Sequence, residues 1–195
     1  MAKEETENLQ IFCRQISDRS RENLAAFHML FQAKLCGNTL SLIGQEIDSM
    51  IRVVYLLSVA DLKYRNALIK ASVNGERWRH AGTKKPITDR QMVDIATTHE
   101  FWMSQAYKVR NGFVHLSHLH DYRHRDPLTL IPKQDKREIL KHMWKWHRCP
   151  KQTARGFNDI VPCLPNVFSK MQQHLSVYVR QLENGAVLRA PKNAV

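Results

Sequence analysis

The segment from residue 39 to about residue 69 constrains the fold most, because apolar residues recur along it at helical spacing. The apolar positions form one broad face, made of Leu42, Ile43, Ile47, Met50, Ile51, Val54, Leu57 and Leu62. A helix with so broad an apolar face is expected to be buried between other helices. The chain of 195 residues also has only seven Gly and seven Pro, which suits helices better than a loop-rich β architecture.

Four further segments show the same periodicity and complete the predicted bundle. They are residues 4–35, which residues 17–20 could divide in two, residues 88 to about 118, residues 134–146 and residues 166–183. Thr88 and Gln91 form a capping-box pattern at the start of the second of these. We therefore predict an all-α fold, a helical bundle of about five helices. Residues 1–130 are expected to form one helical domain, and residues 131–195 a C-terminal helical extension packed on the same domain.

The charge of the chain indicates a polyanionic partner. The formal net charge is +12 and the pI is about 9.8. Between residues 108 and 155 there are 12 Lys and Arg against 4 Asp and Glu, together with six His. Such a field attracts nucleic acid or other phosphate-rich molecules, although a merely basic soluble protein is the simpler alternative. We expect RNA as the partner.

Membrane insertion and secretion are not expected. The longest apolar run, residues 53–60, is far shorter than the roughly 20 residues that a membrane span needs. The first seven residues lack the charged-then-apolar layout of a signal peptide. The four cysteines are scattered, with no Cys-x-x-Cys pair: Cys13, Cys36, Cys149 and Cys163. We predict that they are reduced thiols and that the protein is cytoplasmic.

Residues 102–122 carry an unusual polar stripe opposite an apolar one. The apolar stripe comprises Trp102, Ala106, Val109, Phe113 and Leu116, and the polar stripe Tyr107, Asn111, His115, His118 and Tyr122. Solvated helix faces normally carry Lys, Glu, Asp and Gln. Here an imidazole could transfer protons near neutral pH, and the nearby Arg110 could clamp two phosphate oxygens. On an ideal helix Arg110 and His115 lie about 140° apart, so we expect local distortion, made easier by Gly112.

Arg110, Asn111 and His115 together read Arg-Asn-x-x-x-His, which resembles the Arg-x4–6-His signature of the HEPN superfamily. The resemblance spans roughly residues 35–122. It implies an all-α, HEPN-like domain that acts as a metal-independent endoribonuclease without a cofactor. By the same resemblance two copies would form a homodimer with both motifs across one cleft. The 2′-hydroxyl of RNA would be the nucleophile, and a 2′,3′-cyclic phosphate and a 5′-hydroxyl the products. The resemblance also implies a toxin–antitoxin or phage-defence role, restrained by a separate antitoxin or regulatory protein.

The expected roles follow from this chemistry. His115 would be the acid or base, Arg110 the transition-state clamp, and Asn111 would hold the tautomer of His115 or bind phosphate. Supporting roles are expected for Glu46, His118 and Tyr107, with Glu46 taken from the acidic or polar residue that HEPN domains often carry on this helix. The expected RNA-binding cations are Arg77, Arg79, Lys84, Lys85, Lys108, Arg123 and Arg125. Trp78, among them, is either a hydrophobic plug or a base-stacking residue.

Two alternatives stay open. The first is a catalytically inactive HEPN-like module that binds RNA or a protein partner. The second is a zinc site, for which the first candidate set is His115, His118, His120 and His124. A weaker set is His142, His147, Cys149 and Cys163. We favour a site without a metal ion.

Overall fold

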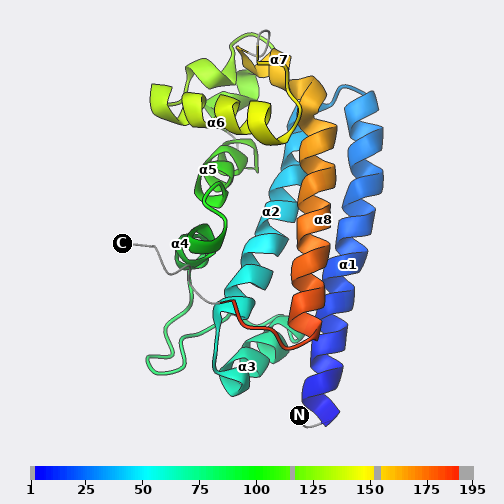
Figure 1. Cartoon of the computed structure of the whole chain (residues 1–195), viewed down its shortest axis with the longest axis vertical. Helices are drawn as coiled ribbons and strands as arrows, with labels where there is room; N and C mark the ends of the chain where they lie inside the picture. Colours follow the sequence, from blue (N-terminus) through cyan, green and yellow to red (C-terminus); the bar gives the residue numbers. More distant parts are fainter. Residues whose placement is uncertain (1–2, 115–116, 152–154, 189–195) are drawn as a thin grey trace. The chain divides into compact units, whose positions relative to one another are not determined.

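A computed structural model of the chain describes residues 3–114, 117–151 and 155–188 (Figure 1). Every regular element in these residues is a helix, and the one β contact is an isolated bridge between Arg79 and Pro86. The α-helices are α1 (Lys3–Gln32), α2 (Cys36–Ser58), α3 (Leu62–Val73), α4 (Asp89–His99), α5 (Met103–Val114), α6 (Lys133–Trp146), α7 (Phe157–Ile160) and α8 (Leu164–Glu183). Three short 3-10 helices are η1 (His118–Asp121), η2 (Pro127–Thr129) and η3 (Val161–Cys163). The all-α prediction is confirmed.

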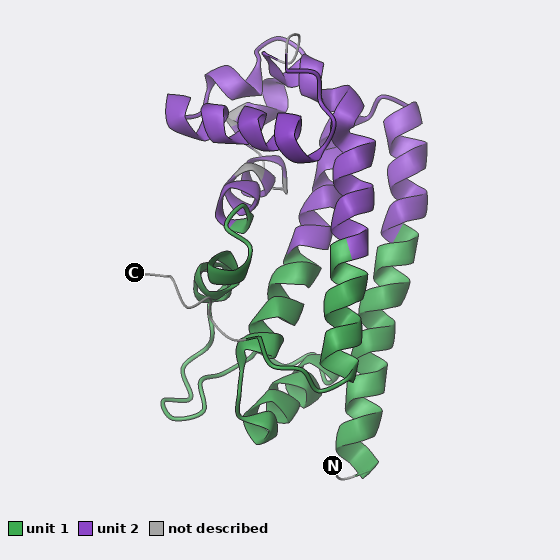
Figure 2. Ribbon diagram, viewed as in Figure 1, with its two compact units in different colours: residues 1–22, 48–103, 174–195 green, residues 23–47, 104–173 purple. Residues whose placement is uncertain are grey.

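The chain forms two compact units, coloured separately in Figure 2. Unit 1 contains residues 1–22, 48–103 and 174–195, and unit 2 contains residues 23–47 and 104–173. The long helices α1, α2 and α8 each contribute one part to unit 1 and the other part to unit 2. The division expected at residue 130 stays a prediction.

The long helices differ from the predicted segments at their breaks. The expected break at residues 17–20 is wrong, because α1 is continuous and Ser20 is buried on the same face as Ile16 and Asn23. The expected single helix over residues 39–69 is also wrong, since it ends at Ser58 and resumes as α3. Asp61 causes the restart, because its carboxylate accepts hydrogen bonds from the backbone N–H groups of the first turn of α3.

The predicted helix over residues 88–118 is likewise two helices, α4 and α5. The capping box between Thr88 and Gln91 is present at the start of α4. Glu100 follows the end of α4, and its two carboxylate oxygens accept hydrogen bonds from the Tyr178 hydroxyl at 2.6 Å and from Trp102 Nε1 at 2.8 Å. Burial, followed by the contact with Glu100, raises the pKa of Tyr178 well above its usual range. These contacts, all within unit 1, fix the break.

The core of unit 1 surrounds the middle of α2. Val53, Val54, Leu56 and Leu57 are fully buried there. Trp78 is 5% exposed and stacks on Tyr55, with ring centroids 5.8 Å apart, so it is a hydrophobic plug. No helix among the described residues is long and apolar enough to cross a membrane.

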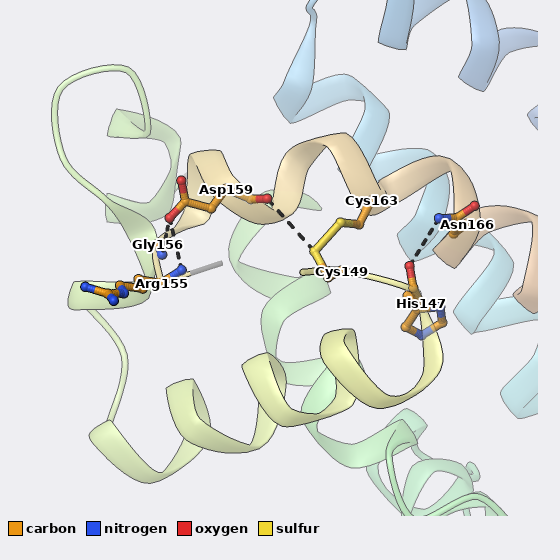
Figure 3. The surroundings of a disulfide bond; sticks show 7 residues. All are labelled: His147, Cys149, Arg155, Gly156, Asp159, Cys163 and Asn166. Atoms are coloured by element: carbon orange, nitrogen blue, oxygen red, sulfur yellow. Dashed lines mark hydrogen bonds between the residues drawn. A yellow bond between two sulfur atoms is a disulfide. The ribbon is translucent and has the colours of Figure 1, made fainter. Parts of the chain in front are cut away.

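Unit 2 has its own core, which contains a disulfide bond (Figure 3). Cys149 and Cys163 are joined, with their Cα atoms 5.7 Å apart. The prediction of four reduced thiols is therefore wrong for this pair. The pair brings the segment after α6 to the segment before α8, two regions that no sequence motif connects. Cys13 and Cys36 are free thiols, and burial raises the pKa of Cys13 to about 12 and that of Cys36 to about 11.

Candidate functional site

The last two turns of α5 hold the arginine of the motif in a defined orientation. Arg110 donates from its guanidinium to Asn111 Oδ1 at 2.8 Å. Its Cζ atom also lies 5.2 Å from the centroid of the Tyr107 ring, within the range of a cation–π contact. Asn111 and Tyr107 both belong to α5, as Arg110 does. The helix therefore positions a guanidinium, the group that best matches a phosphate.

Two serines donate hydrogen bonds to the C-terminal end of α5. Ser41 on α2 donates from its hydroxyl to the carbonyl of Phe113 at 3.2 Å and to that of Gly37 at 3.0 Å. Ser117 donates to the carbonyl of Gly112 at 2.6 Å. The last carbonyls of a helix have no partner within the helix, so side-chain donors stabilise them. These contacts hold the last turn of α5 in place.

Gly112 is required by packing at this end of α5. A Cβ atom on Gly112 would lie 2.2 Å from Cδ1 of Leu119 and 3.1 Å from its Cγ. Leu119 belongs to η1 and is buried in the core of unit 2. The glycine was expected to ease a helix distortion, whereas its visible role is to let η1 pack directly against α5.

An aromatic cluster anchors the same region. Phe113 is 3% exposed and stacks on Phe157, with centroids 5.8 Å apart. Tyr122 contacts both rings, at 6.3 Å from Phe113 and 6.1 Å from Phe157. Its hydroxyl also accepts a hydrogen bond from the backbone N–H of Gly37 at 3.3 Å. Tyr122 is therefore a packing residue that links α2, α5 and α7 within unit 2.

The continuous polar stripe predicted from Tyr107 to Tyr122 is wrong as a single helix face. The helix α5 ends at Val114, and His118 begins the separate 3-10 helix η1. His115 lies outside the described residues, so its predicted role stays a prediction. His118 is described only in its backbone. His120 accepts a hydrogen bond at its Nδ1 from the backbone N–H of Ser117 at 3.3 Å.

Glu46 is a buried carboxylate of unit 2. It is 1% exposed and accepts a hydrogen bond at Oε1 from Asn23 Nδ2 at 2.8 Å. A carboxylate taken out of water needs such donors. Its predicted supporting role stays a prediction. In unit 1, Arg52 Nε lies 3.4 Å from Asp48 Oδ2, four residues earlier on α2, and Arg52 Nη2 lies 3.6 Å from Asp89 Oδ1.

The predicted RNA-binding cations fall in both units. All of them are exposed. Those in unit 1 are Arg77, Arg79, Lys84 and Lys85. Those in unit 2 are Lys108, Arg123 and Arg125. In unit 1, Arg79 donates from its guanidinium to the carbonyl of Lys84 at 3.0 Å, which closes the loop.

In unit 2, Arg123 and Arg125 line a surface pocket of about 310 Å³ between residues 122–126 and 156–159. Asp126 joins the two walls, because its Oδ1 accepts from the backbone N–H groups of Leu128 at 2.8 Å and Phe157 at 3.2 Å. Asp159 Oδ2 accepts from the N–H groups of Arg155 and Gly156, and these backbone hydrogen bonds lower the pKa of Asp159 (Figure 3). Neither aspartate was predicted. Asp126 before Pro127 and Leu128 is the kind of turn signal that could have indicated the first.

The weaker zinc set is wrong in its sulfur ligands, because Cys149 and Cys163 form the disulfide. Across residues 3–114, 117–151 and 155–188, no group of three or more His, Cys, Asp or Glu is arranged to hold a metal ion. The first zinc set contains His115, outside this part of the chain.

Comparison with models of known protein families, with curated proteins and with solved structures finds no match to this chain. A proposal of function therefore depends on the residues and on their geometry.

Proposed function

We propose that this chain is a HEPN-like, metal-independent endoribonuclease that acts as a homodimer. The observation that supports this best is the orientation of Arg110 by Asn111 and Tyr107 at the end of α5, five residues before His115. A guanidinium already held in place loses less conformational entropy when it binds a phosphate. It can also act on the charge that develops in the transition state without reorganising.

The proposed reaction needs two proton transfers. One imidazole takes the proton of the RNA 2′-hydroxyl while that oxygen bonds to the adjacent phosphorus. The bond from phosphorus to the 5′-oxygen breaks, and a second, protonated imidazole gives its proton to that leaving oxygen. His115 of one copy and His115 of the other supply the two imidazoles, which is why the proposal includes a homodimer. Arg110 neutralises charge on the pentacoordinate phosphorus.

The charge around α5 supports RNA as the substrate. Residues 108–155 contain 12 basic residues and only 4 acidic ones, and Lys108, Arg123 and Arg125 are exposed. A toxin–antitoxin or phage-defence role, with a separate antitoxin or regulatory protein as a partner, belongs to the same proposal through the resemblance. The second candidate is an inactive module of the same kind that binds RNA or a protein partner.

The test is cleavage of a mixed RNA substrate in EDTA by the wild type, Arg110→Ala and His115→Ala. Matched controls are Arg14→Ala and His28→Ala, which remove the same side chains from exposed positions on α1. We expect cleavage by the wild type and both controls, cyclic-phosphate ends, and no cleavage by either motif variant. RNA whose 2′-hydroxyls are methylated should not be cleaved by the wild type, because it lacks the nucleophile.

Two outcomes would contradict the proposal. Cleavage that survives Arg110→Ala and His115→Ala would show that other residues or a contaminant act. Salt-sensitive RNA binding without wild-type cleavage would favour the inactive module.

A further inference from the structure

The exposed side of α6 carries a row of cations at one helical spacing. Arg137, Lys141 and Lys145 are each four residues apart and are all exposed. At about 100° per residue they fall within roughly 80° of the helix circumference. The opposite side of α6, with Leu140 and Met143, is buried in the core of unit 2. We call Arg137, Lys141 and Lys145 the α6 ridge.

An exposed aromatic ring lies at the C-terminal end of this ridge. Trp146 ends α6 and is 42% exposed, whereas most large apolar side chains of unit 2 are buried. Two ammonium groups lie over its ring, Lys145 Nζ at 4.8 Å from the centroid and Lys170 Nζ, from α8, at 4.7 Å. Arg148, two residues after Trp146, is exposed. An aromatic face surrounded by cations is a combination that binds a nucleobase together with its phosphates.

We propose that the α6 ridge and Trp146 form a binding track for single-stranded RNA, with phosphates on Arg137, Lys141 and Lys145. A base stacks on Trp146 once the Lys145 ammonium group turns from the ring to a phosphate. Successive ridge residues are about 6 Å apart along the helix axis, four residues at 1.5 Å each. This spacing is comparable with that of successive phosphates along one extended strand. None of these contacts would read base identity, so the track binds RNA without sequence preference.

The chemistry of α6 favours RNA over a membrane surface. A helix that lies in a bilayer interface needs an apolar face free to enter the lipid. The apolar face of α6 is already buried, and Trp146 is the one large exposed apolar side chain described on it. Glu138, partly buried beside the ridge, accepts a hydrogen bond from Gln134 Nε2 at 3.0 Å. The exposed row itself contains no carboxylate.

The inference rests on the proposed function for the choice of RNA as the strand, but binding can be measured without cleavage. The probe is a 2′-O-methyl oligouridylate of about 12 nucleotides, which has no free 2′-hydroxyl and no base pairing. Its affinity for the full-length protein is measured from 0.05 to 1 M salt for the wild type and for Arg137→Gln/Lys141→Gln/Lys145→Gln. The matched control is Arg14→Gln/Lys63→Gln/Arg180→Gln, which removes three exposed cations from α1, α3 and α8.

Each lost phosphate contact on a single strand should change the slope of log K against log salt by about 0.7. Loss of three ridge contacts should therefore make the negative slope shallower by about 2. Binding should weaken about 100-fold at 0.1 M salt and differ little from that of the wild type near 1 M. The control should bind within about threefold of the wild type. Trp146→Leu should weaken binding about tenfold, whereas Trp146→Phe should retain most of it because a stacking face remains.

Equal binding by the ridge variant and the wild type would overturn the inference, as would a loss that persists at 1 M salt. Ridge-dependent binding to vesicles of phosphatidylserine and phosphatidylcholine, without binding to the oligouridylate, would assign the row to a membrane instead. Far-UV circular dichroism and thermal unfolding establish that each variant is folded, and Gln keeps a high helix propensity. Wild-type cleavage in EDTA is measured separately, so a failure of the track and a failure of the endoribonuclease proposal are distinguishable.

Discussion

Replacement of Gly112 by Ala tests the packing at the end of α5. The new Cβ would lie 2.2 Å from Leu119 Cδ1 and 3.1 Å from its Cγ, whereas carbon atoms pack best at about 3.5–4.0 Å. The Leu119 side chain would have to shift by more than an ångström. It is 4% exposed within the core of unit 2, so its neighbours must shift too.

The magnitude follows from two opposing effects. Overpacking a core costs about 1–3 kcal/mol. Replacing Gly by Ala inside a helix returns up to about 1 kcal/mol. We therefore expect Gly112→Ala to lower the free energy of unfolding by up to about 2 kcal/mol. Gly82→Ala is the control, because a Cβ there meets nothing within 4 Å.

Urea unfolding of a double-mutant cycle gives the decisive measurement. Leu119→Ala alone should cost about 2–5 kcal/mol, since it leaves a cavity. Combined with Leu119→Ala, Gly112→Ala should cost little or stabilise, because the clash is gone. Additive effects of the two substitutions, or a gain in stability from Gly112→Ala alone, would refute the packing described here.

Three further predictions concern the disulfide, an acidic turn and the motif arginine. Cys149→Ser/Cys163→Ser should lower the free energy of unfolding by about 3 kcal/mol, as expected for a loop of about 15 residues, and a thiol titration of the unfolded wild type should find two free thiols and not four. Backbone hydrogen bonds lower the pKa of Asp159, so its stabilising contribution is present above the ordinary aspartate pKa of about 4 and is lost as the pH falls through the lowered folded value. Asp159→Asn should therefore be less stable than the wild type at pH 7 and no less stable at strongly acidic pH, and a difference that is unchanged by pH would contradict this. Arg110→Lys keeps the charge but not the two-pronged guanidinium, so RNA cleavage should fall about 100-fold or more while RNA affinity changes a few-fold. Equal cleavage by this variant and the wild type would argue against the clamp.

Helical periodicity was enough to predict the class of fold, because buried faces at a spacing of 3.6 residues leave little choice. The breaks were not predictable from that signal. The segment 39–69 and the segment 88–118 each keep their apolar period across a break. Each break is stabilised by a specific hydrogen-bond acceptor. Asp61, immediately before α3, accepts from the backbone of the first turn of that helix, and Glu100 accepts from the hydroxyl of Tyr178, which is distant in the sequence. The disulfide was missed for a related reason, since the cysteines lie 14 positions apart in the sequence and only the fold brings them together.

At the candidate site, the sequence predicted the residue types but not their neighbours. Arg110 and Asn111 are adjacent, so any α-helix would place them close together. Nothing in the local pattern indicates that Ser41 and Ser117 would hold the last carbonyls of α5, or that Leu119 would need a glycine beneath it. These contacts join residues that are distant in sequence or separated by the end of the helix. They appear only once the whole of unit 2 is packed.

The observed partner of Arg110 also bears on why an amide occupies position 111. Asn111 was expected to hold the tautomer of His115 or to bind phosphate, and its described contact is to the guanidinium of Arg110. An amide oxygen can orient a guanidinium without neutralising it. A carboxylate at the same place would form an ion pair and cancel much of the positive charge that a phosphate needs. Asn111→Asp should therefore retain the orientation of Arg110 and still weaken RNA binding, which separates the need for orientation from the need for net charge.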